Sequence, residues 1–146
     1  MKVNELRIGN LIYDDEGIFS KVTGMKPLDN AISCENKNGC YVMIDCFTNG
    51  KEVSTGWLLN TDSVKPIPLT EELLLKCGFK KIPKNLYVDD IRDLRTAITY
   101  QNGIITWNED TRMVWVGNIA VDNIKYLHHL QNLYFAITGE ELEVKL

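Results

Sequence analysis

Residues 122–139 read D-N-I-K-Y-L-H-H-L-Q-N-L-Y-F-A-I-T-G, and their apolar side chains recur with the period of an α-helix. At about 100° per residue, one broad face of this helix carries Tyr126, Leu127, Leu130, Leu133, Tyr134 and Ile137. Asp122 or Asn123 can cap the start, and Gly139 suits the left-handed position just past the end. An apolar face of this width needs a sheet to cover, so we expect the helix to pack on the strands that precede it.

The opposite face of this helix carries Lys125, His128, His129 and Asn132. Adjacent helical residues point about 100° apart, whereas two histidines that share a metal on one helix are usually four residues apart. We therefore expect both imidazoles to face solvent or the packing edge and to bind no metal. His128 borders the apolar face, which makes it the better of the two as a candidate general base.

The N-terminal half reads as short strands separated by turn residues. Asp14-Asp15-Glu16-Gly17 lies between two such strands, and Asn38-Gly39 and Thr48-Asn49-Gly50-Lys51 mark further reversals. Five candidate strands follow one another within residues 6–66, one of them at residues 32–34. This pattern predicts an SH3-like small β-barrel over residues 1–66, a fold that hosts many unrelated functions.

A boundary is expected at residues 62–68, D-S-V-K-P-I-P, because two prolines one residue apart prevent a helix from continuing. Thr70 to Cys77 then has the signals of a two-turn helix, with Thr70 as its N-cap and Gly78 just past its end. Candidate strands reach Val116, with a hairpin turn at Asn102-Gly103. The predicted class is α+β: the barrel, then an α+β unit over residues 67–146 in which the last helix covers an antiparallel meander, the two packed as one body.

Composition bounds the function classes. The chain has 146 residues, 45% of them hydrophobic and 25% charged, which is ordinary globular usage. No apolar run approaches the roughly 18 residues of a membrane span, and the first ten residues lack the apolar core of a secretory signal. We expect a cytoplasmic protein without a membrane partner. The net charge is −4, and residues 1–66 and 67–146 contribute −2 each, so no basic arm is present.

The densest basic group consists of Lys76, Lys80, Lys81 and Lys84. Clustered lysines can contact phosphates even in an acidic protein. The alternative is a solvated rim around Phe79, and the sequence favours it.

The densest acidic group consists of Asp89, Asp90 and Asp93, with Glu109 and Asp110 in a neighbouring loop. Carboxylates so placed can hold Mg²⁺ or divide acid and base roles. Aspartates between strands usually bond their own backbone in turns, and Arg92 and Arg95 would offset the charge. We expect turns here.

Four cysteines are present, Cys34, Cys40, Cys46 and Cys77, and no C-x-x-C pair occurs. Zinc sites usually draw on closely paired ligands, so we expect small apolar fillers rather than a metal site. A cysteine nucleophile would need one of the two histidines of the last helix. Gly-rich phosphate loops and the G-x-S-x-G and H-E-x-x-H motifs are absent from the sequence.

The aromatic residues that could form a stacking platform are Trp57, Tyr87, Tyr100, Trp107 and Trp115. Trp107 and Trp115 are symmetric about Thr111, which predicts a cross-strand pair. Packing within the core or on a sheet face is favoured over a binding platform.

Three stretches together resemble a family of small uncharacterised proteins from gut Bacteroidetes and their phages or prophage-like elements. They are E-L-R-I-G-N-L-I-Y-D at residues 5–14, K-P-I-P-L-T-E-E-L-L-L-K-C-G-F at residues 65–79 and I-K-Y-L-H-H-L-Q-N-L-Y-F-A-I-T-G-E-E-L at residues 124–142. The resemblance implies a bacterial or phage-encoded accessory protein. That family has no assigned activity, so no functional residue is transferred.

The sequence therefore favours a non-enzymatic binding or adaptor protein that acts through a protein partner or by self-association, with no cofactor, no metal and no catalytic residue assigned. One alternative is a nucleic-acid-binding accessory protein that uses the lysine group. The other is a small hydrolase built on Asp89, Asp90 and His128.

Overall fold

The computed structural model describes residues 3–27, 40–48, 51–60, 62–82 and 99–145. Contacts divide the chain into two compact units. The first comprises Met1–Pro68, Tyr126–Glu141 and Leu146, and the second comprises Leu69–Lys125 and Leu142–Lys145. This division differs from the expected one, because the last helix is grouped with the N-terminal strands. Two antiparallel sheets and two α-helices in the described residues confirm mixed α+β content.

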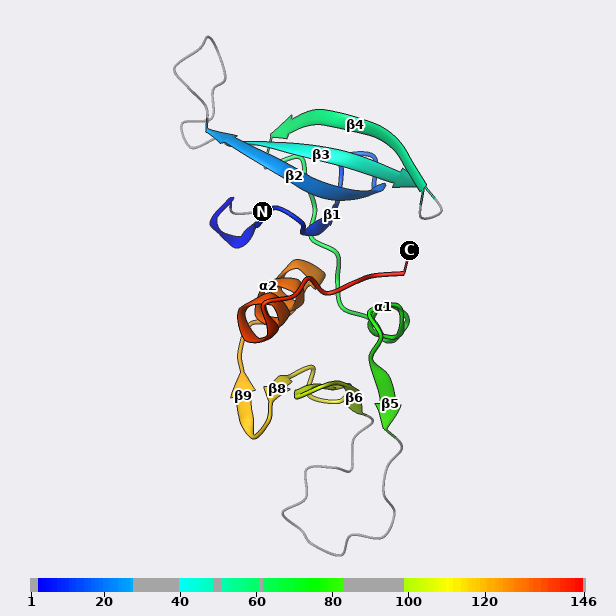
Figure 1. Ribbon diagram of the computed structural model, residues 1–146, viewed down its shortest axis with the longest axis vertical. Coiled ribbons are helices and arrows are strands. Elements are labelled where there is room, and N and C mark those ends of the chain that lie inside the picture. Colours follow the sequence, from blue (N-terminus) through cyan, green and yellow to red (C-terminus); the bar gives the residue numbers. More distant parts are fainter. Residues whose placement is uncertain (1–2, 28–39, 49–50, 61, 83–98, 146) are drawn as a thin grey trace, which may run out of the picture. The chain divides into compact units, whose positions relative to one another are not determined.

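The first unit contains a four-stranded antiparallel sheet in sequence order (Figure 1). A short 3₁₀ turn, η1 (Val3–Glu5), precedes its strands, which are β1 (Leu11–Tyr13), β2 (Phe19–Pro27), β3 (Cys40–Thr48) and β4 (Lys51–Asn60). The expected strand at residues 32–34 lies outside the described residues. The described strands form an open meander. On the side of β1 away from β2, Tyr13 forms one isolated antiparallel bridge with Lys65.

The acidic turn between β1 and β2 is confirmed. The Asp14 carboxylate accepts hydrogen bonds from the backbone N–H groups of Glu16 at 3.0 Å and Ile18 at 2.8 Å. Gly17 has a φ of 84°, which a glycine adopts without steric cost. Aspartate and glycine thus each supply a different part of the reversal.

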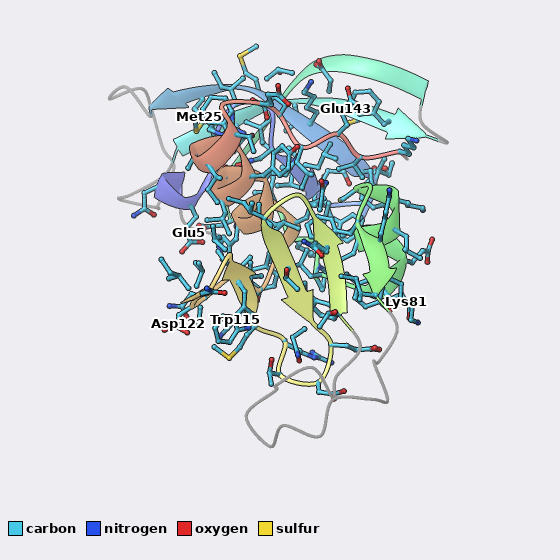
Figure 2. All side chains as sticks on the ribbon, turned by 60° about the horizontal axis from the view of Figure 1, so that its bottom comes forward. Glu5, Met25, Lys81, Trp115, Asp122 and Glu143 are labelled. Carbon is cyan, nitrogen blue, oxygen red and sulfur yellow. The ribbon has the colours of Figure 1, made fainter. Side chains whose placement is uncertain are left out.

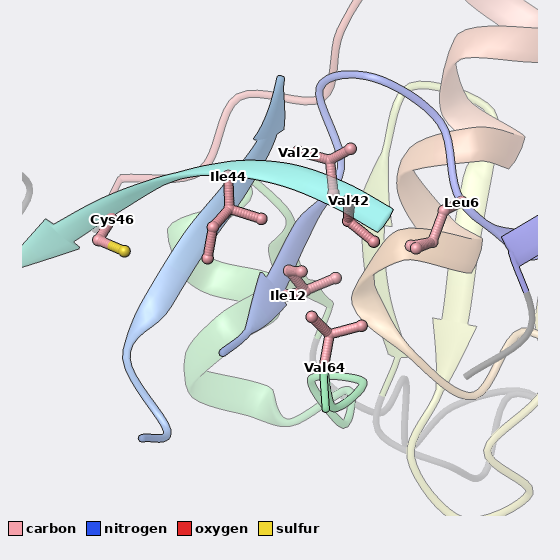
Figure 3. Packing of buried hydrophobic residues seen from close by; sticks show 7 residues of the cluster. All are labelled: Leu6, Ile12, Val22, Val42, Ile44, Cys46 and Val64. Carbon is pink, nitrogen blue, oxygen red and sulfur yellow. The ribbon is translucent and has the colours of Figure 1, made fainter. Parts of the chain in front are cut away.

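The hydrophobic core of this unit lies on one face of the sheet (Figure 3). It consists of Leu6, Ile12, Val22, Val42, Ile44, Cys46 and Val64. A bulge interrupts the pairing of β2 with β3 between Val22 and Gly24. A side chain at Gly24 would begin 3.1 Å from Met43 Sδ, so the Met43 side chain would have to shift to make room for it.

Helix α2 (Leu127–Thr138) ends where the sequence predicts and begins later. Gly139 is left-handed at φ 75°, and its N–H donates to the Phe135 carbonyl at 2.8 Å. The start is set by pairing instead of by a side-chain cap: Tyr126 is extended and bridges Pro68, and the Leu127 N–H donates to the Ile67 carbonyl at 2.8 Å. Asp122 and Asn123, the expected caps, lie in a turn before the helix.

Polar side chains of α2 attach the helix to the N-terminal segment. Gln131, which is 2% exposed, accepts a hydrogen bond from the Leu11 N–H at 2.8 Å. Asn132 accepts from Asn10 Nδ2 at 2.9 Å and donates to the Glu5 carbonyl at 2.9 Å. Both ends of the Asn132 amide are therefore used, and the helix is held in one register along residues 5–11.

Arg7 adds a charged contact within the same unit. Its guanidinium forms two parallel hydrogen bonds with the Glu141 carboxylate, at 2.6 and 2.8 Å, and lies 4.1 Å from the centre of the Phe135 ring. The pKa of Glu141 is lowered mainly by this hydrogen bonding. A fork of this geometry holds the chain just past the helix end.

The second unit begins with the short helix α1 (Glu71–Lys76), whose predicted ends are confirmed. Thr70 Oγ1 accepts a hydrogen bond from the Leu73 N–H at 3.3 Å. Gly78 has a φ of 78°, and the Phe79 N–H donates to the Leu74 carbonyl at 3.0 Å. The sequence of this helix supplies both caps.

A five-stranded antiparallel meander follows, again in sequence order. Its strands are β5 (Lys80–Ile82), β6 (Thr99–Asn102), β7 (Ile105–Asn108), β8 (Val114–Val116) and β9 (Ile119–Val121). Asn102 pairs with Ile105, so the turn residues are Gly103 and Ile104 instead of the expected Asn102 and Gly103. The two edge strands, β5 and β9, were not expected from the sequence.

The predicted pair of Trp107 and Trp115 is wrong. Trp107 pairs with Val114, and Trp115 pairs with Thr106. This one-residue offset puts the two indoles on opposite faces, because side chains alternate along a strand. Trp107 is buried against Tyr100, with ring centres 5.6 Å apart, and Trp115 (labelled in Figure 2) is half-buried.

Replacing Gln131 with leucine should destabilise the protein. The substitution leaves the Leu11 N–H buried without its acceptor, and we expect the free energy of unfolding to fall by about 1–3 kcal/mol. Urea unfolding measures the change. Gln101→Leu on an exposed site is the matched control and should shift the same quantity by less than about 0.5 kcal/mol. Equal effects of the two variants would contradict the role given to Gln131.

Candidate functional site

The two histidines occupy the first turn of α2 and do not share one environment. His128 is 0% exposed and His129 is half-buried. The expectation that both imidazoles face solvent or the packing edge does not hold for His128, which is fully enclosed. The reason is that Gln131 and Asn132 bond residues 5–11 of the N-terminal segment, so the uncharged polar face of α2 is turned inward and not toward solvent.

Three aromatic rings meet at the start of this helix. The His128 and His129 rings lie 4.2 Å apart at an interplanar angle of 65°. Tyr126 stacks nearly parallel to His128, with ring centres 5.8 Å apart and an angle of 8°, and meets the edge of His129 at 5.4 Å. The edge-to-face contact brings nitrogens of the two imidazoles close together although the residues are adjacent in sequence.

A carboxylate completes this group. Glu5 is half-buried at the end of η1, and its carboxylate oxygen and one nitrogen of each imidazole all lie within 4.8 Å of one another. The Asn132 amide positions it by donating to the Glu5 carbonyl at 2.9 Å. Asn132 lies one helical turn beyond the histidines, so the bond that docks the helix also presents the Glu5 side chain to them. We refer to Glu5, His128 and His129 as the Glu-His-His cluster.

Burial of the His128 side chain favours its neutral form. Desolvation is the main cause that lowers its pKa to about 4, and the charge of a protonated His129 acts in the same direction. Among the described residues, neither ring nitrogen of His128 has a hydrogen-bond partner, and neither does Nδ1 of His129. Buried nitrogens without partners are uncommon in folded proteins.

This arrangement suits ligation better than acid-base catalysis. A buried imidazole with a pKa near 4 is a weak base at neutral pH, so the candidate role of His128 as a general base is not supported. Neutral imidazole nitrogens beside a carboxylate oxygen are donors that transition metals accept. Although adjacent helical residues point about 100° apart, one nitrogen of each imidazole lies within 4.8 Å of the other, so the two side chains converge on one place.

The lysine group carries less free positive charge than its sequence indicates. Lys76 Nζ lies 3.0 Å from Glu72, and Lys81 Nζ (labelled in Figure 2) lies 2.7 Å from Glu71. Lys81 also lies 5.6 Å from the centre of the Tyr100 ring. Lys80 is exposed, and Lys84 lies outside the described residues. Neighbouring glutamates thus neutralise two of the four positions.

The acidic group is only partly described. Asp89, Asp90 and Asp93 lie outside the described residues, as do Arg92 and Arg95. Glu109 is half-buried and Asp110 is exposed in the loop between β7 and β8. Within the described residues, Glu5 is the one carboxylate that is grouped with His128, and no pair of carboxylates lies there.

Two of the four cysteines can be placed. Cys46 and Cys77 are buried free thiols, and burial raises the pKa of Cys77 to about 12. A thiol of this pKa stays protonated at neutral pH and is a poor nucleophile. Cys77 acts as an apolar filler, whereas the Cys46 thiol also donates a hydrogen bond to Asp14 Oδ2 at 3.7 Å and accepts one from Ser20 Oγ at 3.5 Å. Cys34 and the side chain of Cys40 lie outside what the structure describes.

The aromatic residues do not gather into one described platform. Tyr100 and Trp107 are buried, and Trp115 faces the opposite side of the sheet. Tyr87 and the side chain of Trp57 lie outside the described residues.

Comparisons with family models, with curated proteins and with solved structures give no match. In the described residues, no helix is long and apolar enough to cross a membrane.

Sequence reasoning missed the Glu-His-His cluster, yet one signal was present. Helix α2 contains no aspartate, glutamate, lysine or arginine between Leu127 and Thr138. A solvated helix face usually carries charges, whereas His, Gln and Asn together are typical of a face that makes specific buried hydrogen bonds. The pairing with Glu5 had no local signal, because the contact joins opposite ends of the chain.

The acid stability of the protein should depend on His128. Its pKa is about 4 in the folded state and about 6.5 in the unfolded chain. Between these values the unfolded state binds the extra proton, so the free energy of unfolding is highest above about pH 6.5 and falls as the pH drops toward about 4. His128→Leu removes this contribution, on the order of 2 kcal/mol.

Urea unfolding at a series of pH values, with a chelator present, measures this dependence. The groups that act on the ring, which are Glu5, Tyr126, His129 and the N-terminal ammonium, stay unchanged in the variant. The wild type should lose more stability on acidification than His128→Leu does. The same acid slope in both proteins would show that His128 is not the group responsible.

Proposed function

We propose that this chain is a non-enzymatic binding protein that self-associates by strand addition at the β9 edge of its five-stranded sheet. The observation that carries the proposal is the contrast between the two edges of that sheet. One edge has the residues that proteins use to prevent strand pairing, and the other lacks them.

Strand β5 is the guarded edge. Its sequence is Lys80-Lys81-Ile82, and all three residues are exposed. Lysine on an edge strand opposes pairing with another chain, because a second strand would have to desolvate or displace the ammonium groups. Lys81 is in addition held by Glu71, which fixes a charged pair beside this edge.

Strand β9 is the open edge. Its sequence is Ile119-Ala120-Val121, without a charge or a proline. Ile119 is 71% exposed and Ala120 is exposed, and in the described part of the chain β9 pairs with β8 alone. An uncharged, apolar edge of this kind is a template for an added strand, with backbone hydrogen bonds supplying affinity and side chains supplying specificity.

A second exposed isoleucine lies at the same end of the sheet. Ile104 is 56% exposed in the turn between β6 and β7, and its carbonyl accepts a hydrogen bond from the Gly117 N–H at 2.9 Å. Gly117 belongs to the turn that leads into β9. The apolar surface of the edge therefore continues around the end of the sheet.

A second copy of this chain is the proposed occupant of the edge. Antiparallel pairing of β9 with β9 about a two-fold axis would use the same residues on both copies, the arrangement commonest in homodimers. The strand is short, so the association should be weak and concentration-dependent. The proposal includes an SH3-like barrel in the N-terminal unit, a cytoplasmic location and the phage or mobile-element association that the sequence resemblance implies.

The two alternative functions have less support. Binding of nucleic acid would depend on lysines of which Lys76 and Lys81 are paired with glutamates. A hydrolase would need His128 as a base, and that imidazole is buried with a pKa lowered to about 4.

Ile119→Lys should abolish self-association. A lysine at the open edge places on β9 the same obstacle that β5 already carries. In size-exclusion chromatography with light scattering, we expect the mass of the wild type to rise above 16.7 kDa with concentration and that of the variant to stay at the monomer value.

Ile82→Lys is the matched control, because it makes the same change on the other edge of the same sheet. It should associate as the wild type does. A wild-type protein that remains monomeric at every concentration, or equal loss of association in both variants, would refute the proposed use of β9.

A further inference from the structure

We infer that the Glu-His-His cluster is a binding site for one divalent transition-metal ion of the Zn²⁺ type. The ligands are the carboxylate of Glu5 and one imidazole nitrogen from each of His128 and His129. This site is independent of the β9 edge and goes beyond the proposed binding function.

The donor chemistry fits such an ion. Zn²⁺ is commonly bound by imidazole nitrogen together with carboxylate oxygen, and a hard ion such as Mg²⁺ prefers oxygen alone. All three donor atoms already lie within 4.8 Å of one another. Two nitrogens around a tetrahedral ion with Zn–N bonds of about 2.0–2.1 Å are about 3.3 Å apart. The donors therefore have to approach by at most about 1.5 Å, which side-chain rotation can provide.

The backbone around the donors is fixed by contacts that do not involve a metal. The start of α2 is held by the Leu127 N–H bond to the Ile67 carbonyl, and Glu5 is held through its carbonyl by Asn132. Tyr126 lies nearly parallel to the His128 ring, with ring centres 5.8 Å apart. These contacts join positions as far apart in sequence as Glu5 and Asn132, which are separated by 127 residues. A site supported in this way loses little freedom when a ligand binds.

Burial of His128 is the second observation that indicates a ligand. Its side chain is 0% exposed, and both ring nitrogens are without hydrogen-bond partners among the described residues. Such nitrogens disfavour the folded state, because water satisfied them in the unfolded chain. A metal bond to one nitrogen would compensate for part of this loss.

One interaction opposes a cation at this place. The first turn of a helix carries partial positive charge from its unpaired N–H groups, and this repels a metal ion as it repels a proton. The carboxylate of Glu5 supplies the opposing negative charge. With three protein donors, at least one coordination position is left for water or an anion.

Isothermal titration calorimetry with ZnCl₂ tests the inference on the full-length chain after removal of metal with EDTA. We expect one ion per chain. Glu5→Gln and His129→Asn change half-buried side chains and should fold normally, as circular dichroism can verify. Each should weaken Zn²⁺ affinity by about 10- to 100-fold or more. Glu16→Gln, an exposed glutamate in the β1–β2 turn of the same unit, is the matched control and should bind as the wild type does.

Titration with Co²⁺ identifies the ligand atoms by absorption spectroscopy. Ligand-field bands without thiolate charge-transfer absorption are expected for nitrogen and oxygen donors. Thiolate bands would place the ion on the cysteines and overturn the inference. Absence of binding in saturating metal, or unchanged affinity in both Glu5→Gln and His129→Asn, would also overturn it. Ile119→Lys should bind the metal normally, so failure of this site and failure of the β9 edge are distinguishable.

Discussion

The amide of Asn132 joins the two ends of the chain within the first unit. It accepts hydrogen bonds from Asn10 and Arg7 and donates to the Glu5 carbonyl, while the neighbouring Gln131 receives the Leu11 N–H. These bonds are directional, and buried polar groups that lose their partners are costly. The register of α2 along the N-terminal segment is therefore set by polar contacts as well as by its apolar face. The positions of both histidines follow from this one constraint.

The hydrogen bonds that dock α2 also leave one buried side chain, His128, in an unfavourable environment. The same rotation that satisfies Gln131 and Asn132 encloses His128 with its ring nitrogens unpaired among the described residues. Folded proteins tolerate such groups when other interactions compensate for them or when a function requires them. Here the imidazole lies beside a second imidazole and a carboxylate. An arrangement that disfavours the bare fold and has the donors of a metal site is more readily understood as a binding site than as packing alone.

Local signals in the sequence were reliable where a turn or cap depends on adjacent residues. Thr70 and Gly78 end the short helix as predicted, Asp14 and Gly17 form the first hairpin turn, and Gly139 ends α2. Predictions that depended on pairing between strands were less accurate. The offset of Trp115 against Trp107 is a single residue, and such a shift moves a side chain to the other face. The loop symmetry about Thr111 contained no information on that register.

The sequence by itself determined the α+β content, the ends of the short helix, the turn chemistry of the hairpins and the end of α2, because each depends on interactions within a few residues. Only the tertiary structure decided which face of α2 is enclosed, that Glu5 meets His128 and His129, and that β9 is an uncharged sheet edge. These features depend on contacts between segments far apart in the chain. Hydrophobic periodicity reports how much of a helix is buried, but hydrogen bonds from a distant segment decide which polar side chains are enclosed with it.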